Sequence, residues 1–224
     1  MFEFLTLQNL PETQSLLVRP PTNTRPAVRR VQSGKVQAVV KDFSRLGFLY
    51  RNTAGRFLVW REAKAYRHLQ GLDGIPELFR VIDGLALVIE EIPGRNLENA
   101  YKDFTLPISF FNELEKLVNR VHERRLAHCD LKKEANVLLG ADGRPYIIDW
   151  GAAIFEREFR FYPFNIIFQR FLKDDHMAVV KLKLAHIPEA VTSAEKARYA
   201  YRSPAECLVR AVRDLLRRLL QKVV

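Results

Sequence analysis

The sequence predicts a mixed α+β fold of two lobes, with a β-rich amino-terminal lobe and a minimal, mainly helical carboxy-terminal lobe. Two observations predict this order: an alternating apolar segment followed by a helical segment in the first third of the chain, and a short β-hairpin pattern after residue 136. With 224 residues, 48% of them hydrophobic, the chain can bury one substantial core. We expect a single unit, with residues 1–92 as the first lobe and residues 93–224 as the second.

Three segments define the expected amino-terminal lobe. Residues 36–41 alternate between apolar and polar side chains and end in Lys41, which is typical of a half-buried strand. Residues 60–69 form a good helical segment that contains Glu62. Residues 85–94 read as a buried strand that runs into a connecting segment. That connection holds Glu90, Glu91 and Ile92.

The expected hairpin follows the most informative segment, which is His128–Asn136 (HCDLKKEAN). Residues 137–139 and 146–148 are short apolar runs on either side of a turn that contains Gly143, so they predict two strands joined by a hairpin. Asn136 and Asp149 flank this hairpin. We therefore expect both side chains at the same end of the small sheet.

These residue types suit the transfer of a phosphoryl group. Such a reaction needs a positioned hydroxyl, neutralised phosphate charge and excluded water more than covalent help. Asp130 can take or orient a hydroxyl proton, and Lys132 would lie beside the transferring group as a point charge. The carboxylate of Asp149 and the amide oxygen of Asn136 are hard ligands of the kind that Mg²⁺ prefers.

In this order, the features resemble the protein-kinase-like superfamily, whose signature is a histidine-containing loop with Asp and Asn, followed by an Asp-Phe-Gly triplet. The resemblance covers roughly residues 30–151 and implies a two-lobed protein-kinase-like fold, with ATP between the lobes and Mg²⁺ as its partner. It also implies that Lys41 holds the α/β-phosphates, that Glu62 pairs with that lysine, and that adenine bonds to the backbone of the connecting segment. The residues implied at adenine are Glu90, Glu91 and Ile92. His128 is implied as a structural residue.

Four departures from the family pattern qualify the resemblance. No Gly-rich loop precedes Lys41, and residues 20–26, rich in Pro, Thr and Asn, lie where the phosphate-covering loop is expected. Cys129 replaces the arginine that often binds a phosphorylated activation loop. Asn136 lies six positions after Asp130, one more than usual. Trp150 replaces the phenylalanine of the triplet.

The carboxy-terminal part is short, because only 75 residues follow Asp149. This economy is similar to the compact bacterial kinases of Kdo and lipopolysaccharide-core sugars and to the RIO kinases. The resemblance implies a kinase that moves the γ-phosphate of ATP to a hydroxyl, with a lipopolysaccharide-core sugar or similar glycolipid as the favoured acceptor. A RIO-like serine/threonine protein kinase and a non-catalytic pseudokinase or binding adaptor remain as alternatives.

The composition bears on location and partners. The chain has two cysteines, Cys129 and Cys207, in no spaced pair, and it shows neither a signal-peptide start nor an apolar run of membrane-spanning length. We expect a cytoplasmic protein, with peripheral contact to the cytoplasmic face of the inner membrane as one option. Formal charge is +7 over residues 1–61, −3 over residues 62–153 and +6 over residues 154–224. Basic ends suggest an anionic partner, and no recognition motif favours nucleic acid.

Three carboxy-terminal features keep two interpretations each. Phe159–Leu172 interleaves aromatic residues with arginine, as in an interfacial membrane segment or in a helix whose aromatics form a core. Pro204–Val224 predicts an amphipathic helix, either packed on the catalytic lobe or docked to a membrane or partner. Asp174, Asp175 and His176 could bind a metal or substrate, or could mark a helix start or an exposed turn.

Overall fold

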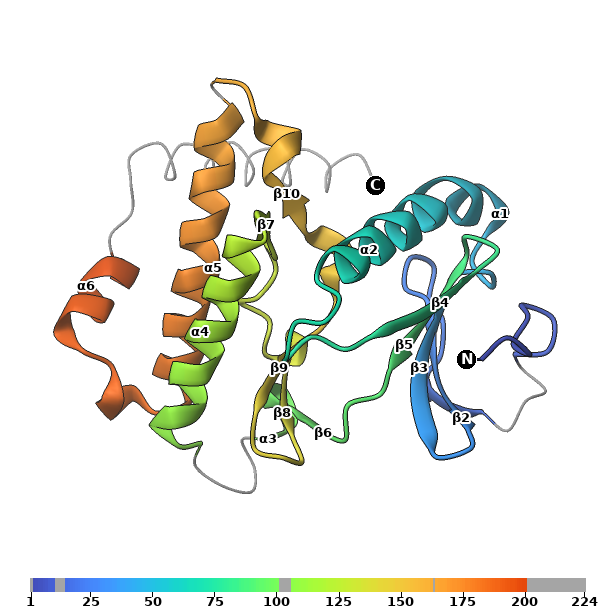
Figure 1. Ribbon diagram of the computed structural model, residues 1–224, viewed down its shortest axis with the longest axis horizontal. Helices are drawn as coiled ribbons and strands as arrows, with labels where there is room; N and C mark the ends of the chain where they lie inside the picture. Colours follow the sequence, from blue (N-terminus) through green and yellow to red (C-terminus); the bar gives the residue numbers. More distant parts are fainter. Residues whose placement is uncertain (1, 11–14, 101–105, 163, 201–224) are drawn as a thin grey trace, which may run out of the picture.

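The computed structural model describes residues 2–10, 15–100, 106–162 and 164–200. It has the predicted mixed α+β architecture, in which a β-rich amino-terminal part is followed by helices (Figure 1). This arrangement is compatible with a kinase-like two-lobed fold. The helix expected at residues 204–224 lies outside the described residues.

An antiparallel sheet forms the amino-terminal part, with its five strands in the order β1-β2-β3-β5-β4. These strands are β1 (Leu16–Arg19), β2 (Ala27–Ser33), β3 (Val36–Asp42), β4 (Leu78–Ile82) and β5 (Ala86–Glu90). The predicted strand at residues 36–41 is β3. It follows β2 through a two-residue turn in which Gly34 has φ = +61°, a conformation that glycine adopts without a steric penalty.

Helix α2 (Arg56–His68) accounts for most of the predicted helical segment and packs on β4 and β5. It follows the short helix α1 (Phe48–Tyr50) and a π-helical turn, η1 (Arg51–Gly55). The buried face of α2 repeats at helical spacing and consists of Val59, Glu62, Ala63, Ala65 and Tyr66. A carboxylate on an otherwise apolar face requires a partner, because an unpaired buried charge is costly.

The second part contains short strands and longer helices. Its strands are β6 (Gly94–Asn96), β7 (Leu126–Ala127), β8 (Val137–Gly140), β9 (Pro145–Ile147) and β10 (Ile154–Phe155). Its α-helices are α3 (Leu97–Ala100), α4 (Ile108–Glu123), α5 (Phe164–His186) and α6 (Ser193–Ala200). The 3-10 turns are η2 (Glu134–Asn136), η3 (Trp150–Ala152), η4 (Glu156–Phe159) and η5 (Pro188–Ala190). The predicted hairpin is confirmed, since β8 and β9 pair antiparallel.

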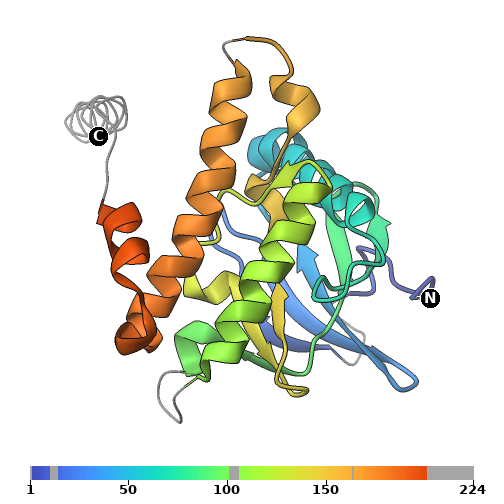
Figure 2. The same ribbon diagram turned by 60° about the vertical axis from the view of Figure 1, so that its left-hand side comes forward.

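Helices α4 and α5 lie side by side and support the second part (Figures 1 and 2). The apolar face of α4 repeats at helical spacing through Phe110, Phe111, Leu114, Leu117, Val118 and Val121. One hydrophobic core joins both parts, because residues of α2 and β5 pack in the same cluster as residues of α4 and α5. The elements that carry the site described below therefore share one packed interior.

A second, smaller core covers the other face of the amino-terminal sheet. Residues 2–10 fold back onto this face and bury Phe2, Leu5 and Leu10. The guanidinium of Arg80 donates to three backbone carbonyls of this segment, including that of Glu3 at 2.6 Å. The sheet is thus covered on both faces.

Two interpretations of the carboxy-terminal segments are wrong for the described residues. The aromatics of the 159–172 segment do not fill the core of the small lobe, because Phe161, Tyr162 and Phe164 are exposed and only Phe168 is buried. The polar group at residues 174–176 neither starts a helix nor sits in an exposed turn, because it lies in the middle of α5. Among the described helices, none has the length and apolarity needed to cross a membrane.

Candidate functional site

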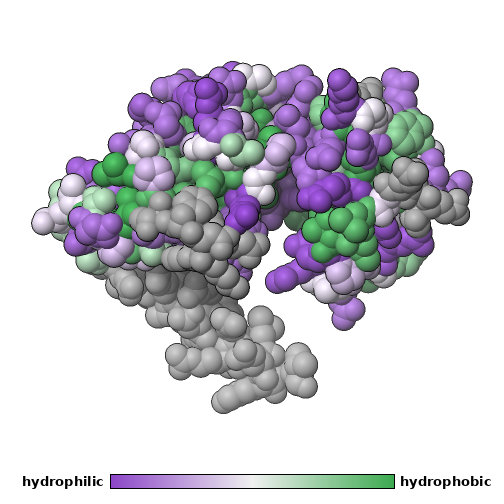
Figure 3. Space-filling model, turned by 90° about the horizontal axis from the view of Figure 1, so that it is seen from below, coloured by the Kyte–Doolittle hydropathy of each residue, from purple (hydrophilic) through white to green (hydrophobic). Residues whose placement is uncertain are grey.

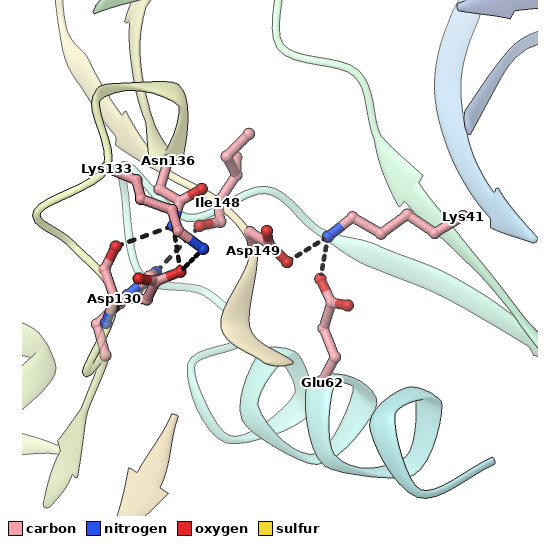
Figure 4. Close-up of polar contacts among 8 residues, drawn as sticks. Lys41, Glu62, Asp130, Lys133, Asn136, Ile148 and Asp149 are labelled. Carbon is pink, nitrogen blue, oxygen red and sulfur yellow. Dashed lines mark hydrogen bonds and ion pairs between the residues drawn. The ribbon is translucent and has the colours of Figure 1, made fainter. Parts of the chain in front are cut away.

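Three charged side chains from distant parts of the chain meet at one point, with Glu62 and Asp149 both in contact with Lys41 (Figure 4). The Lys41 ammonium, from β3, lies 2.6 Å from Oε1 of Glu62 on α2. It also lies 2.8 Å from Oδ1 of Asp149, which precedes η3 and is 108 positions away in sequence. The predicted pair of Lys41 and Glu62 thus forms, and Asp149 joins it.

Lys41, Glu62 and Asp149 shift one another's pKa values. Burial alone would lower the pKa of Lys41, but the carboxylates of Glu62 and Asp149 together raise it above its usual value, so the lysine stays a cation. Lys41 in turn lowers the pKa of Asp149. Burial raises the pKa of Glu62, against the opposing effect of Lys41. The result is a fixed positive charge next to an ionised carboxylate.

Asp149 lies at the boundary between interior and solvent. Its backbone has φ = +68°, in the left-handed region, where a non-glycine residue is strained unless its surroundings hold it. The side chain is 48% exposed, whereas the next residue, Trp150, is fully buried and packs edge-on against the ring of His128. The turn thus buries the indole and leaves the carboxylate accessible. Seen from below, the surface is notched between the two parts of the molecule (Figure 3).

The second half of the site is the loop from His128 to Asn136. The side-chain amide nitrogen of Asn136 donates to the backbone carbonyl of Asp130 at 3.0 Å and lies 3.4 Å from its Oδ2. Asn136 is buried in η2, so its orientation is fixed. Because the amide is planar, its oxygen points away from Asp130, where it can serve as a ligand.

The two lysines of this loop are placed differently. The ammonium of Lys133 lies 2.5 Å from Oδ2 of Asp130, in contact with the carboxylate (Figure 4). Lys132 is exposed, and its backbone carbonyl accepts a hydrogen bond from Lys181 at 3.0 Å. The structure thus brings the second of the two lysines, and not the one chosen from the sequence, to Asp130.

His128 has a structural place, as the resemblance implied. The backbone N–H of Asp130 donates to its Nδ1 at 3.2 Å, so the ring proton is assigned to Nε2, which donates to the carbonyl of Ile148 at 3.0 Å. The imidazole therefore ties the Asp130 loop to the strand that leads into Asp149. This bridge holds the two carboxylates in a fixed relationship.

Asp175 is the important residue that the sequence analysis did not place. Its carboxylate accepts hydrogen bonds from the backbone N–H groups of His128 at 2.7 Å and Cys129 at 3.0 Å, and from Nε2 of His122 at 3.2 Å. It is 2% exposed. Its spacing offered a signal, since it falls seven positions after Phe168 and four before Val179 on the buried face of α5.

Cys129 takes the strained position in the loop. It has φ = +67°, and its backbone N–H is held by Asp175. Burial raises the pKa of its thiol well above the usual value, so the thiol stays protonated and is a poor nucleophile. Cys129 thus has a structural role in the loop.

The connection between the two parts is ordered by backbone hydrogen bonds. The backbone N–H of Glu90 donates to the carbonyl of Glu77 at 2.8 Å, and that of Glu91 donates to the carbonyl of Gln37 at 3.1 Å. The Glu91 carboxylate forms an ion pair with Arg30 at 2.5 Å. Ile92, the third residue implied at adenine, follows β5 and is half-buried. Residues 20–26, without a glycine, connect β1 to β2.

The oxygen ligands available here suit Mg²⁺ held together with a nucleotide. Among the described residues no cluster of three or more His, Cys, Asp or Glu side chains is arranged to hold a metal. Asp149 and Asn136 supply one carboxylate and one amide oxygen. Mg²⁺ usually takes one or two protein oxygens and completes its shell with phosphates and water. The donor set fits that description.

Glu158 of η4 binds two basic residues of α2, the helix that carries Glu62. It accepts hydrogen bonds from Arg61 at 2.7 and 3.1 Å, from Lys64 at 2.8 Å and from the backbone N–H of Phe155 at 3.2 Å. These donors outweigh its partial burial and lower its pKa from 4.5 to about 2. The carboxylate therefore remains charged down to low pH and holds the end of the small sheet to the helix of Glu62.

The hydrogen bonds of the Glu158 carboxylate predict that the stability of the folded protein depends on pH. Because the folded pKa is depressed, the stabilisation is fully present above pH 4.5 and is lost as the pH falls from 4.5 towards 2. We expect Glu158→Gln to lower the free energy of unfolding by about 2 kcal/mol at pH 7, and by clearly less at pH 3.5. Urea titrations of both proteins at the two pH values measure the difference. An equal difference at both values would contradict this role of the ionised carboxylate.

Comparison with known proteins supports a kinase-like relationship over part of the chain. No protein-family model matches it. It is 42% identical over 69 residues to the proteins named serine/threonine-protein kinase PknD of Chlamydia trachomatis serovar D and of Chlamydia muridarum. The match covers 30% of this chain and only 7% of the length of each relative. The similarity concerns a short segment.

Proposed function

We propose that the protein is an ATP-dependent phosphotransferase that moves the γ-phosphate to a hydroxyl group. The observation that carries the proposal is the convergence of Glu62 and Asp149 on one partly buried lysine, Lys41, in a molecule whose second part presents Asp130 and Asn136 on one ordered loop. A fixed cation next to an accessible carboxylate suits a phosphate chain with its magnesium. The partial similarity to serine/threonine kinases supports the same class of reaction.

In this proposal each residue has a distinct task. Lys41, held by Glu62, binds the α- and β-phosphates. Adenine bonds to backbone groups of Glu90, Glu91 and Ile92 other than the N–H groups of Glu90 and Glu91, which already donate to the carbonyls of Glu77 and Gln37. Asp149 and Asn136 hold Mg²⁺, which when bound offsets phosphate charge. Asp130 accepts the proton of the acceptor hydroxyl. The hydroxyl oxygen forms a bond to the γ-phosphorus while the bond between this phosphorus and the leaving ADP oxygen breaks.

Mutation can distinguish the roles of Lys132 and Lys133. Lys133 contacts one carboxylate oxygen of Asp130, Oδ2, and a phosphate beside the loop offers its ammonium a second partner. We therefore assign the charge-offsetting task to Lys133 and expect Lys133→Ala to lower kcat by at least about tenfold with little change in the KM for ATP. Steady-state kinetics with Lys132→Ala as the matched control tests this. A larger loss in Lys132→Ala would return the task to Lys132, as the sequence suggested.

The acceptor has two candidate classes. The name of the PknD proteins favours a serine or threonine hydroxyl of a protein. The lipopolysaccharide-core sugar or similar glycolipid expected from the sequence is favoured by the exposed aromatic side chains at Phe161, Tyr162 and Phe164, which suit a membrane-bound acceptor. Both acceptors are compatible with a protein that works in the cytoplasm, where ATP is available, and that touches the inner membrane peripherally.

One labelling experiment tests the activity and separates the acceptors. Purified protein and γ-labelled ATP are incubated with the protein fraction and with the lipid fraction of a bacterial lysate, with Asp130→Asn as the control. Magnesium-dependent label that enters either fraction only with the unmodified protein supports the phosphotransferase, and the labelled fraction identifies the acceptor class. The absence of glycine between β1 and β2 makes a pseudokinase the alternative. No transfer above the control would favour it.

A further inference from the structure

A basic pocket lies away from the Lys41 site, at the end of α2 and between η4 and α5. It has a volume of about 630 Å³, and four of its lining residues are arginines: Arg124, Arg125, Arg157 and Arg160. Glu156 is the acidic residue of the lining, and it pairs with Arg125. The pocket therefore keeps an excess of positive charge. None of the residues assigned to phosphate transfer lines it.

Large apolar side chains surround the start of α5 and alternate in sequence with residues that line this pocket. Phe161 is 76% exposed and Tyr162 is 80% exposed, and the exposed set continues along the helix with Phe164, Ile166 and Ile167. Isolated exposed apolar residues are ordinary, but a contiguous group of this size marks an interaction surface. We call this group the aromatic tip.

The aromatic tip protrudes from the molecule beside the basic pocket. Figures 1 and 2 show that the start of α5 and the preceding turn reach beyond α4, at one end of the structure. Phe168 is buried and lines the basic pocket, so the exposed first turn of α5 lies directly beside the pocket. Farther along the helix, Asp175 binds the loop of Asp130. The helix that begins at the tip thus also carries the residue that holds this loop.

We propose that the aromatic tip and the basic pocket together form a docking site for a bilayer that contains anionic phospholipid. Phe, Tyr and Ile side chains partition into the boundary between headgroups and acyl chains, and arginines beside them gain from the negative surface potential. The pocket gives guanidinium groups in a recess that a phosphate headgroup can enter. The excess positive charge of the pocket argues for this occupant over an apolar protein partner, which would supply no negative charge to balance it.

Vesicle binding without ATP tests the docking site independently of catalysis. Sedimentation with vesicles of phosphatidylcholine alone, and of phosphatidylcholine with about one third phosphatidylglycerol, is expected to recover the protein mainly with the anionic vesicles. Asp149→Asn should bind them like the unmodified protein. Loss of transfer activity with retained vesicle binding would then concern the proposed function and not the docking site.

Two variants and two matched controls locate the contact. We expect Phe161→Ser/Tyr162→Ser and Arg157→Ser/Arg160→Ser each to weaken partitioning into anionic vesicles by about tenfold. The controls remove equally exposed apolar residues of α1, in Phe48→Ser/Leu49→Ser, and exposed cations of the first part, in Lys35→Ser/Arg45→Ser. They should bind like the unmodified protein.

Three results would overturn the proposal. The first is equal recovery with neutral and anionic vesicles, and the second is equal losses in the variants and in their controls. The third is lipid-free self-association in size-exclusion chromatography that disappears in Phe161→Ser/Tyr162→Ser, which would assign the aromatic tip to a second copy of the chain. Circular dichroism of each variant shows whether it is folded before its binding is compared.

Discussion

Asp149→Asn is expected to lower phosphate transfer by at least about a thousandfold while the protein stays folded. The substitution removes the negative charge that Lys41 contacts at 2.8 Å and that the proposal assigns to Mg²⁺. The side chain is 48% exposed, so an amide of the same size can occupy the position without a cavity. Transfer of labelled phosphate under saturating Mg·ATP measures the loss. Asp130→Ala is expected to abolish transfer in the same assay.

The matched control is Asp73→Asn, an exposed aspartate outside the site. It should transfer phosphate like the unmodified protein, and both variants should keep the unmodified circular dichroism spectrum. Substantial turnover in Asp149→Asn would show that the carboxylate is dispensable, and the assignment of the site would then fail.

Asp175→Ala is expected to cost about 3–5 kcal/mol of unfolding free energy, because it leaves buried donors without their acceptor. The two backbone N–H groups of His128 and Cys129 lose their partner, and so does the ring of His122. Cys129 also holds a left-handed backbone that these bonds stabilise. Any molecules that remain folded should show reduced transfer, because Asp130 follows directly in the loop.

The neighbouring Asp174 provides the control. It lies on the same helix, pairs with Arg170 at 3.0 Å and is 43% exposed, so Asp174→Ala should change stability by less than about 0.5 kcal/mol. Urea titration of both variants measures the difference. If Asp175→Ala has too little folded population, Asp175→Asn, which keeps one oxygen acceptor, should show a smaller loss in the same direction. Equal stabilities of the two alanine variants would contradict the anchoring role.

Much of the fold could be predicted because its elements have clear local periodicity. The alternation at residues 36–41 gave β3, and the hairpin pattern gave β8 and β9. The pair of Lys41 and Glu62 was a different kind of prediction, because it followed from the resemblance to a family. The contact of Lys41 with Asp149 was not predicted, since no local pattern relates residues 108 positions apart.

The remaining features depend on tertiary packing. Lys133 and not Lys132 reaches Asp130, and a tight turn with no periodicity gives no rule for that choice. Asp175 looked like part of a polar cluster because its neighbours Asp174 and His176 are polar, although helical rotation separates their faces. The aromatics of the 159–172 segment appeared suited to a core, but α5 begins beyond the body of the molecule and leaves them exposed.

A thermal-shift titration with Mg·ATP tests the central claim most directly, because a ligand that binds only the folded state must raise the melting temperature. At about a hundred times its dissociation constant, Mg·ATP should raise the melting temperature by about 5 °C or more. The same titration of Asp149→Asn should lose the magnesium-dependent part of this rise. No rise in the unmodified protein, or an identical rise in Asp149→Asn, would contradict the assignment of Lys41, Glu62 and Asp149 as the Mg·ATP site.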